Sequence, residues 1–191
     1  FYYYQNLLGV NGFAAKKVLL WGSERDLLIK HRNLFGKFAN WVNNAKFLNS
    51  FKMKSEDMAR YADTINSFKP EILRGYASSL YSFSKYLDQN DKKIYSPRYV
   101  VSTAEPLRNQ MRDLIEKVMG TKVYNFYGSR EIASLAGECH EGLLHYFPFY
   151  TKLEVLDDDN NPVKAGEEGK IVVTNLFNYS MPLIRYEIGD M

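Results

Sequence analysis

The stretch RYVVSTAEPL, residues 98–107, begins with strand-forming apolar residues and ends with polar ones, and KVYNFYGSRE, residues 122–131, repeats that transition. Between the two strands, apolar residues recur at the spacing of one helix face: Leu107, Met111, Leu114, Ile115 and Val118. Pro106 suits the first helical position and Gly120 suits the helix end. A strand, a helix and a strand joined by short links predict a right-handed crossover within a parallel sheet.

The residues before this unit extend the same pattern. Apolar spacing predicts helices over 24–48 and 55–68, a strand over 71–75 and a helix over 78–87. Strands that alternate with helices are typical of one parallel sheet covered by helices. The predicted fold class of this part is therefore α/β, with strand–helix repeats on a parallel sheet.

The last third of the chain lacks a helical period. Strands are predicted over 143–150, 152–156, 170–176 and 183–186, separated by clusters of turn-forming residues. This pattern predicts an antiparallel sheet or partial barrel. We expect two subdomains: an α/β subdomain over 1–140 and a β-rich subdomain over 141–191.

The composition excludes several classes of protein. The chain has 191 residues, 46% of them hydrophobic, and a net charge of +3, which argues against a disordered or collagen-like chain and against nucleic-acid binding. The single cysteine, Cys139, forms no intrachain disulfide and fits a reducing, cytoplasmic location. No apolar run is long enough to cross a bilayer, so no membrane partner is predicted. The abrupt first and last residues suggest a piece of a longer protein.

Functional groups gather after the two strands quoted first. Open parallel sheets bind ligands at the carboxyl ends of their strands. The segment Tyr127–Glu131 offers an aromatic ring, a glycine, a hydroxyl, a guanidinium and a carboxylate. The ring suits a nucleotide base, the hydroxyl and guanidinium suit phosphate, and the carboxylate suits Mg²⁺. From composition alone, an ordinary polar turn is the alternative.

Several segments resemble one family in order and spacing. NFYGSRE, residues 125–131, resembles the Asn-x-Tyr-Gly-x-Thr-Glu motif of adenylate-forming enzymes, which include acyl-CoA synthetases, luciferases and peptide-synthetase adenylation domains. Residues 168–176 resemble their Gly-Glu-hydrophobic strand, and residues 182–190 their Tyr-Arg-Thr-Gly-Asp motif. Three further stretches are similar to the phenylacetate–CoA ligase branch, which includes relatives in capsular polysaccharide biosynthesis: residues 21–26, 73–76 and 102–107. The chain thus resembles part of the large N-terminal domain of this superfamily.

The resemblance implies an acid–thiol ligase. Its reaction is ATP-dependent conversion of a carboxylic acid, such as phenylacetate or another aryl acid, into an acyl-adenylate and then a CoA thioester. The implied cofactors are ATP, Mg²⁺ and CoA, and the implied partners are ATP or AMP, the small acid and CoA. A homodimer of the full-length protein is a further expectation.

The resemblance also assigns roles to residues. Tyr127 would stack on adenine, and Asp190 would accept hydrogen bonds from both ribose hydroxyls. Glu131 would ligate Mg²⁺ between the ATP phosphates and, with Arg130, is a catalytic candidate. The other nucleotide-binding candidates are Ser102, Thr103, Ala104, Glu105, Asn125, Gly128 and Ser129. Of these, the first four would line the adenine edge, and Asn125, with Tyr124, would meet the carboxylate and the α-phosphate.

The chain departs from the family pattern in three respects. Arg130 replaces the usual Thr, where it would either clamp phosphate or turn outward to an acid. Glu187 and Ile188 replace the usual Arg-Thr before Gly-Asp. The Ser/Thr/Gly-rich phosphate loop and the lysine-bearing C-terminal domain are missing from these residues. We therefore expect that this chain alone does not catalyse adenylation.

Other functions remain as alternatives. The chain would be a nucleotide-binding module without catalysis, an adenylating enzyme of capsular polysaccharide biosynthesis with an acceptor other than CoA, or a basic nucleic-acid binder. Cys139, His140 and His145 are candidate zinc ligands, with ordinary loop roles as the alternative. Tyr76, Tyr81 and Phe83 are candidates either for an aromatic-acid pocket or for the core.

Overall fold

The computed structural model describes residues 3–11, 14–22 and 42–190, and the chain divides into two compact units. Unit 1 comprises residues 1–126 and 138–143, and unit 2 comprises residues 127–137 and 144–191. The chain therefore passes between the units after residues 126, 137 and 143. The subdomain boundary at residue 140 stays a prediction, because compactness alone does not define an independently folding domain.

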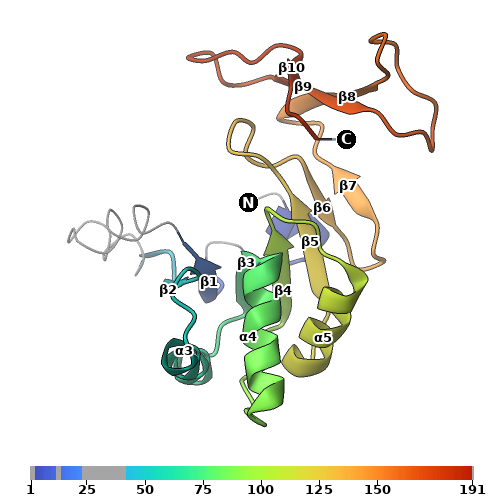
Figure 1. The fold of residues 1–191 in the computed structure, drawn as a ribbon. Coiled ribbons are helices and arrows are strands. Elements are labelled where there is room, and N and C mark those ends of the chain that lie inside the picture. Colours follow the sequence, from blue (N-terminus) through green and yellow to red (C-terminus); the bar gives the residue numbers. More distant parts are fainter. Residues whose placement is uncertain (1–2, 12–13, 23–41, 191) are drawn as a thin grey trace. The chain divides into compact units, whose positions relative to one another are not determined.

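Five parallel strands form the sheet of unit 1 (Figure 1). They are β1 (Lys17–Trp21), β2 (Ala45–Asn49), β3 (Ile72–Tyr76), β4 (Tyr99–Thr103) and β5 (Val123–Tyr127). The strand order is β2-β1-β3-β4-β5, followed by β6 (Ala136–Glu138) and β7 (Leu144–Tyr146). The predicted parallel sheet is confirmed, and all five residues of β4 are buried, as expected where both faces are covered.

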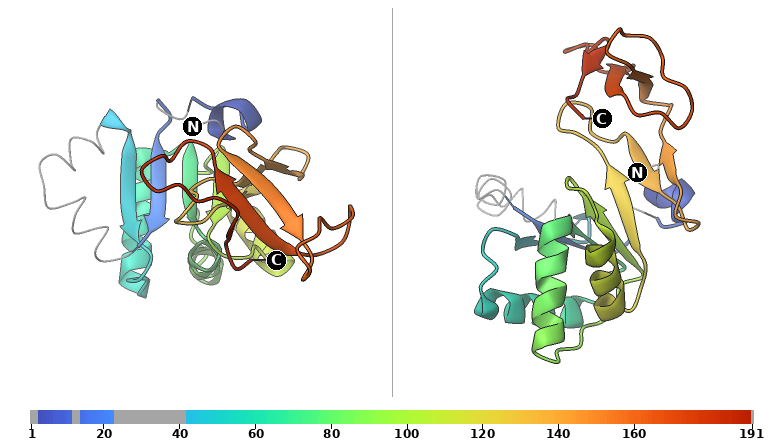
Figure 2. Two further views of the ribbon diagram at one scale, coloured as in Figure 1. Left: turned by 90° about the horizontal axis from the view of Figure 1, so that it is seen from above. Right: turned by 45° about the vertical axis from the view of Figure 1, so that its right-hand side comes forward.

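Three helices supply the apolar core on one face of this sheet. They are α3 (Ser55–Phe68), α4 (Ala77–Gln89) and α5 (Asn109–Met119), and α4 lies beside α5 (Figures 1 and 2). Phe83 and Ile115 contribute helix side chains to this core, and Val100 contributes from β4. The π-helix η1 (Tyr3–Leu7) leads to Leu8, whose carbonyl oxygen accepts a hydrogen bond of 2.7 Å from the Tyr99 hydroxyl. Because strand side chains alternate, Tyr99 faces away from Val100 and the helices.

The predicted helix over 24–48 is wrong at its end. Residues 23–41 lie outside the described residues, but Ala45–Asn49 form β2, which pairs in parallel with β1. A short apolar run such as AKFLN fits both periods, and pairing with β1 decides in favour of the strand. β1 itself, KVLLW, has the continuous apolar sequence of a buried parallel strand but was not predicted.

The helix predicted to begin at Pro106 begins three residues later, at Asn109. Ala104 has the left-handed φ of 65°, and Arg108, in an extended conformation, precedes the first helical residue. The Glu105 carboxylate accepts a 2.7 Å hydrogen bond from the Ser78 amide in the first turn of α4. This contact holds the connection away from helical geometry. Gly120 ends α5 with a φ of 68°, as predicted.

Unit 2 contains the predicted antiparallel sheet, made of β8 (Thr151–Leu156), β9 (Lys170–Asn175) and β10 (Tyr186–Glu187) in the order β10-β9-β8. The strand predicted over 143–150 is shortened to β7, because residues 148–150, beginning with Pro148, form a turn. The strand predicted over 183–186 is likewise reduced to β10. No helix within the described ranges has both the length and the apolar character needed to cross a membrane.

Candidate nucleotide site

Tyr127 and Asp190 meet within unit 2, although 63 positions separate them in the sequence. The Tyr127 hydroxyl donates a hydrogen bond of 2.6 Å to Asp190 Oδ2. Burial raises the pKa of Tyr127 above its ordinary value, and the Asp190 carboxylate raises that pKa further. The two residues predicted to hold adenine and ribose therefore lie at one place, and each occupies a polar group of the other.

Backbone contacts bring the two residues together. The Ile171 amide in β9 donates to the Asp190 carbonyl oxygen at 3.0 Å, so the last residues run beside that strand. The Leu135 amide donates to the Tyr127 carbonyl oxygen at 3.0 Å. Buried Leu135 and Val173 belong to the apolar cluster against which Tyr127 packs. Ordinary packing thus fixes the polar pair.

The segment after Tyr127 forms a turn that presents two free charges. The Ser129 hydroxyl accepts a 3.2 Å hydrogen bond from the Ile132 amide, and the Ser129 carbonyl accepts one of 2.9 Å from Ala133. Arg130 and Glu131 are exposed at this turn. Neither has a hydrogen bond or an ion pair to another residue in the described part of the chain. Both charges are accessible to a phosphate or a cation.

The four adenine-edge candidates of unit 1 lie where β4 ends. Ser102 and Thr103 are buried, and Ser102 Oγ has no hydrogen-bond partner among residues 3–11, 14–22 and 42–190. Ala104 turns the chain, and the Glu105 side chain is used at the start of α4. One oxygen of the exposed Glu105 carboxylate is therefore already engaged by α4.

Asn125 and Tyr124 point to opposite faces of β5, because successive strand residues alternate. The Tyr124 hydroxyl lies 2.9 Å from His140 Nδ1, and the backbone N–H of Asn125 donates to Glu138 Oε2 at 2.7 Å. His140 is thus a partner of a buried tyrosine. No group of three or more metal-binding side chains occurs in the described part of the chain, so the structure gives the zinc alternative no support.

An aromatic and cationic cluster at the ends of β1 and β3 was not predicted as a unit. The rings of Trp21 and Tyr76 stack with centroids 4.8 Å apart. The Arg74 guanidinium lies 4.5 Å from the ring centroid of Phe126 and 5.7 Å from that of Trp21. The strand order reverses between β1 and β3, which is where open sheets form ligand crevices. By contrast, Phe83 is a core residue.

Comparison with known proteins identifies the family. A family model described as AMP-binding enzyme matches residues 42–179, which is most of the chain. The chain belongs to this family of AMP-binding enzymes. The resemblance to adenylate-forming enzymes is thereby confirmed.

Two sequence relatives of this AMP-binding chain indicate its branch. Protein CapK of Staphylococcus aureus is 28% identical over 176 residues, which cover 92% of this chain and 38% of that protein. Phenylacetate-coenzyme A ligase of Thermus thermophilus is 31% identical over 135 residues, which cover 66% of this chain and 30% of that protein. The chain therefore spans less than two fifths of the length of either relative.

Solved structures share the fold of this AMP-binding chain. A 2-hydroxyisobutyryl-CoA ligase in complex with 2-HIB-AMP and CoA matches with a TM-score of 0.74 and 18% identity, over 95% of this chain and 40% of that one. The anthranilate CoA ligase AuaEII in complex with anthranoyl-AMP matches with a TM-score of 0.63 and 19% identity, over 90% of this chain and 33% of that one. At these identities the likeness establishes the fold alone.

Proposed function

We propose that the protein activates a carboxylic acid with ATP and transfers the acyl group to CoA, and that this chain supplies the adenosine-binding part of the site. A carboxylate oxygen attacks the α-phosphorus of ATP, and the bond to the bridging oxygen breaks, so that pyrophosphate leaves with the electron pair. The thiol of CoA then loses its proton, attacks the acyl carbon and displaces AMP. The meeting of Tyr127 and Asp190 in an AMP-binding chain carries this proposal.

In the proposed complex, Tyr127 stacks on adenine and Asp190 accepts hydrogen bonds from the ribose. Ribose hydroxyls replace the Tyr127 hydroxyl as donors to Asp190, so the polar pair opens when the nucleotide binds. Ser102, Thr103, Ala104 and Glu105 contact the adenine edge, with Glu105 acting through its backbone. The buried Ser102 Oγ, which has no partner in the described ranges, supports a polar role at this strand end.

In this proposal, the turn after Tyr127 binds the phosphates and their Mg²⁺. Glu131 fits Mg²⁺, since this ion is commonly held by one or two carboxylates together with substrate phosphates and water. Mg²⁺ supplies charge neutralisation at the phosphates when it is bound. Arg130 offers a bidentate donor to a phosphate oxygen. Gly128 and Ser129 give the backbone a close approach to this region.

For the acid, we propose an aryl acid such as phenylacetate. The phenylacetate-coenzyme A ligase relatives support this class, as does the stacked pair of Trp21 and Tyr76. A second candidate is a capsule-related acyl group passed to an acceptor other than CoA. It is favoured by the likeness to protein CapK, which extends over 92% of the chain.

A carboxylate-dependent ATP–pyrophosphate exchange assay on the full-length protein tests the proposal. Phenylacetate should support Mg²⁺-dependent exchange, and Glu131→Ala should abolish most of it, whereas Glu141→Ala, at another exposed acidic position, should not. A protein that binds nucleotide in the absence of Mg²⁺, and that shows no exchange with any acid tested, would instead be a non-catalytic module. We further propose that the 191-residue chain alone does not catalyse adenylation, and it should therefore give no exchange in the same assay.

A further inference from the structure

Glu138 links the two ends of the segment that carries Tyr127–Glu131. Residues 127–137 leave unit 1 after β5 and return to it at Glu138. At the first end, the backbone N–H of Asn125 donates a 2.7 Å hydrogen bond to Glu138 Oε2. The Glu138 side chain is only 10% exposed. One buried carboxylate therefore connects residues 125 and 138, which flank the proposed nucleotide-binding segment on both sides.

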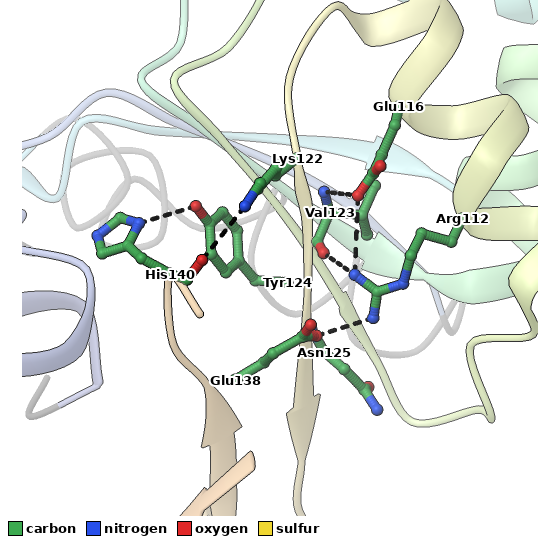
Figure 3. A network of polar contacts seen from close by, with 8 residues as sticks. All are labelled: Arg112, Glu116, Lys122, Val123, Tyr124, Asn125, Glu138 and His140. Carbon is green, nitrogen blue, oxygen red and sulfur yellow. Dashed lines mark hydrogen bonds and ion pairs between the residues drawn. The ribbon is translucent and has the colours of Figure 1, made fainter. Parts of the chain in front are cut away.

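Arg112 on α5 fixes this carboxylate from the helix layer (Figure 3). Its Nη2 lies 2.9 Å from Glu138 Oε2, and its Nη1 donates to the Val123 carbonyl oxygen. Glu116, one helical turn further along, lies 3.7 Å from Arg112 Nη1 and accepts a 2.9 Å hydrogen bond from the Val123 amide. The guanidinium thus has two carboxylates and a carbonyl as partners, which leaves it one orientation.

The three contacts to β5 serve one edge of that strand. The backbone groups of Val123 and Asn125 point to the same side, because backbone direction alternates along a strand. Side chains are the hydrogen-bond partners of three backbone groups on that side: the Val123 amide, the Val123 carbonyl and the Asn125 amide. Charged partners make these hydrogen bonds stronger than neutral ones. Arg112, Glu116 and Glu138 therefore add to the pairing with β4 that positions β5.

A second anchor lies just beyond Glu138. The His140 ring contacts the Tyr124 hydroxyl at 2.9 Å, and the Lys122 ammonium donates to the His140 carbonyl oxygen at 3.2 Å (Figure 3). The residues that follow Glu138 are therefore held to the same strand. The returning end of the segment is therefore held at Glu138 and again at His140, whereas Arg130 and Glu131 are exposed.

We propose that Arg112 and Glu138 are positioning residues that set the geometry of the Tyr127–Glu131 segment for ATP. The inference rests on the proposed function. Arg130 and Glu131 are exposed within the segment 127–137, and the Glu138 contacts hold the residues at its two ends, 125 and 138. Small displacements of reacting groups reduce rates by up to about 100-fold. Both residues act through the backbone of β5: Glu138 accepts from the Asn125 backbone amide, and Arg112 holds the Glu138 carboxylate in place.

The test uses Glu138→Gln in the full-length protein, with Glu71→Gln as matched control. Glu71 forms an exposed ion pair with Arg98 at 3.4 Å in the same unit. Glu138→Gln removes the charge that holds Arg112 but keeps an oxygen for Asn125. We expect the KM for ATP in the exchange assay to rise about tenfold and kcat to fall, with the KM for the acid unchanged. Amide hydrogen exchange of residues 127–137 should accelerate in the same variant and not in the control.

A loss of thermal stability with an unchanged KM for ATP and unchanged amide hydrogen exchange would overturn the inference. The contacts of Glu138 would then only stabilise β5. Arg112→Lys serves as a second variant if Glu138→Gln does not fold: it keeps the charge, loses the fork of donors and should give a weaker change of the same kind. If the unmodified protein shows no ATP–pyrophosphate exchange, the proposed function fails. Amide exchange would then still decide whether the pair holds the segment.

Discussion

The two units differ in how deeply their side chains are buried. Unit 1 buries every residue of β4 between layers, whereas every residue of β10 in unit 2 is exposed. Large apolar side chains such as Phe177 and Tyr179 are also exposed in unit 2. Yet the Tyr127–Asp190 pair lies in unit 2. We infer that unit 1 contributes most of the stability and that unit 2 presents the more accessible of the proposed binding groups, in keeping with a rigid scaffold that carries functional loops.

The largest expected effect tests where stability resides. Phe83→Ala in α4 should lower the free energy of unfolding by about 3–5 kcal/mol, because it removes a fully buried ring and leaves a cavity. The matched change Phe177→Ala, at a ring that is 64% exposed, should cost under about 0.5 kcal/mol. Chemical denaturation of both variants measures the difference. Equal losses would remove the contrast between the units.

The second effect concerns binding. Asp190→Asn in the full-length protein should weaken AMP binding by about tenfold or more, because hydrogen bonds to a charged acceptor contribute about 1.5–3 kcal/mol. The side chain is exposed, so the unfolding free energy should change little. Calorimetric titration with AMP gives the affinity. Unchanged affinity in a correctly folded variant would contradict the assignment of Asp190 to the ribose.

A smaller effect is expected at the start of α4. Glu105→Ala removes the acceptor of the Ser78 amide and should destabilise unit 1 by about 1 kcal/mol. Because the proposed contact of Glu105 with adenine uses its backbone, AMP affinity should stay within twofold or so of the original value. Thermal unfolding and AMP titration separate the two readouts. A large affinity loss without destabilisation would assign the carboxylate itself to the base.

The smallest effect is the pH dependence of the polar pair. The pKa of Tyr127 is raised in the folded protein, so its stabilising contribution is complete below the unfolded value near 10 and is lost as the pH rises above it. Between pH 9 and 11, the original protein should lose stability relative to Tyr127→Phe by under about 1 kcal/mol, since water screens this half-exposed group. Parallel stability curves for the two proteins would contradict a raised pKa.

Local signals predicted the elements whose period was long or whose ends were marked. The apolar stripe of α5 and Gly120 at its end are examples, and the strands predicted at 71–75, 98–102 and 122–126, which correspond to β3, β4 and β5 shifted by one residue, follow from their links to helices. The sequence pattern does not predict β1 or β2, because a short apolar run fits both the helix period and the strand period. The start of α5 was misplaced because Glu105 makes a distant contact with Ser78 that no local pattern encodes.

The candidate site divides in the same way. The order of the sequence motifs predicts Tyr127, Glu131 and Asp190 as site residues, because the chemistry and spacing within each motif are local properties of the chain. Only the tertiary structure brought Tyr127 to Asp190 across 63 positions. The contact of Glu138 with Arg112, at the ends of the proposed binding segment, is likewise visible only in the tertiary structure, because a buried carboxylate is recognised by the partners that folding brings to it.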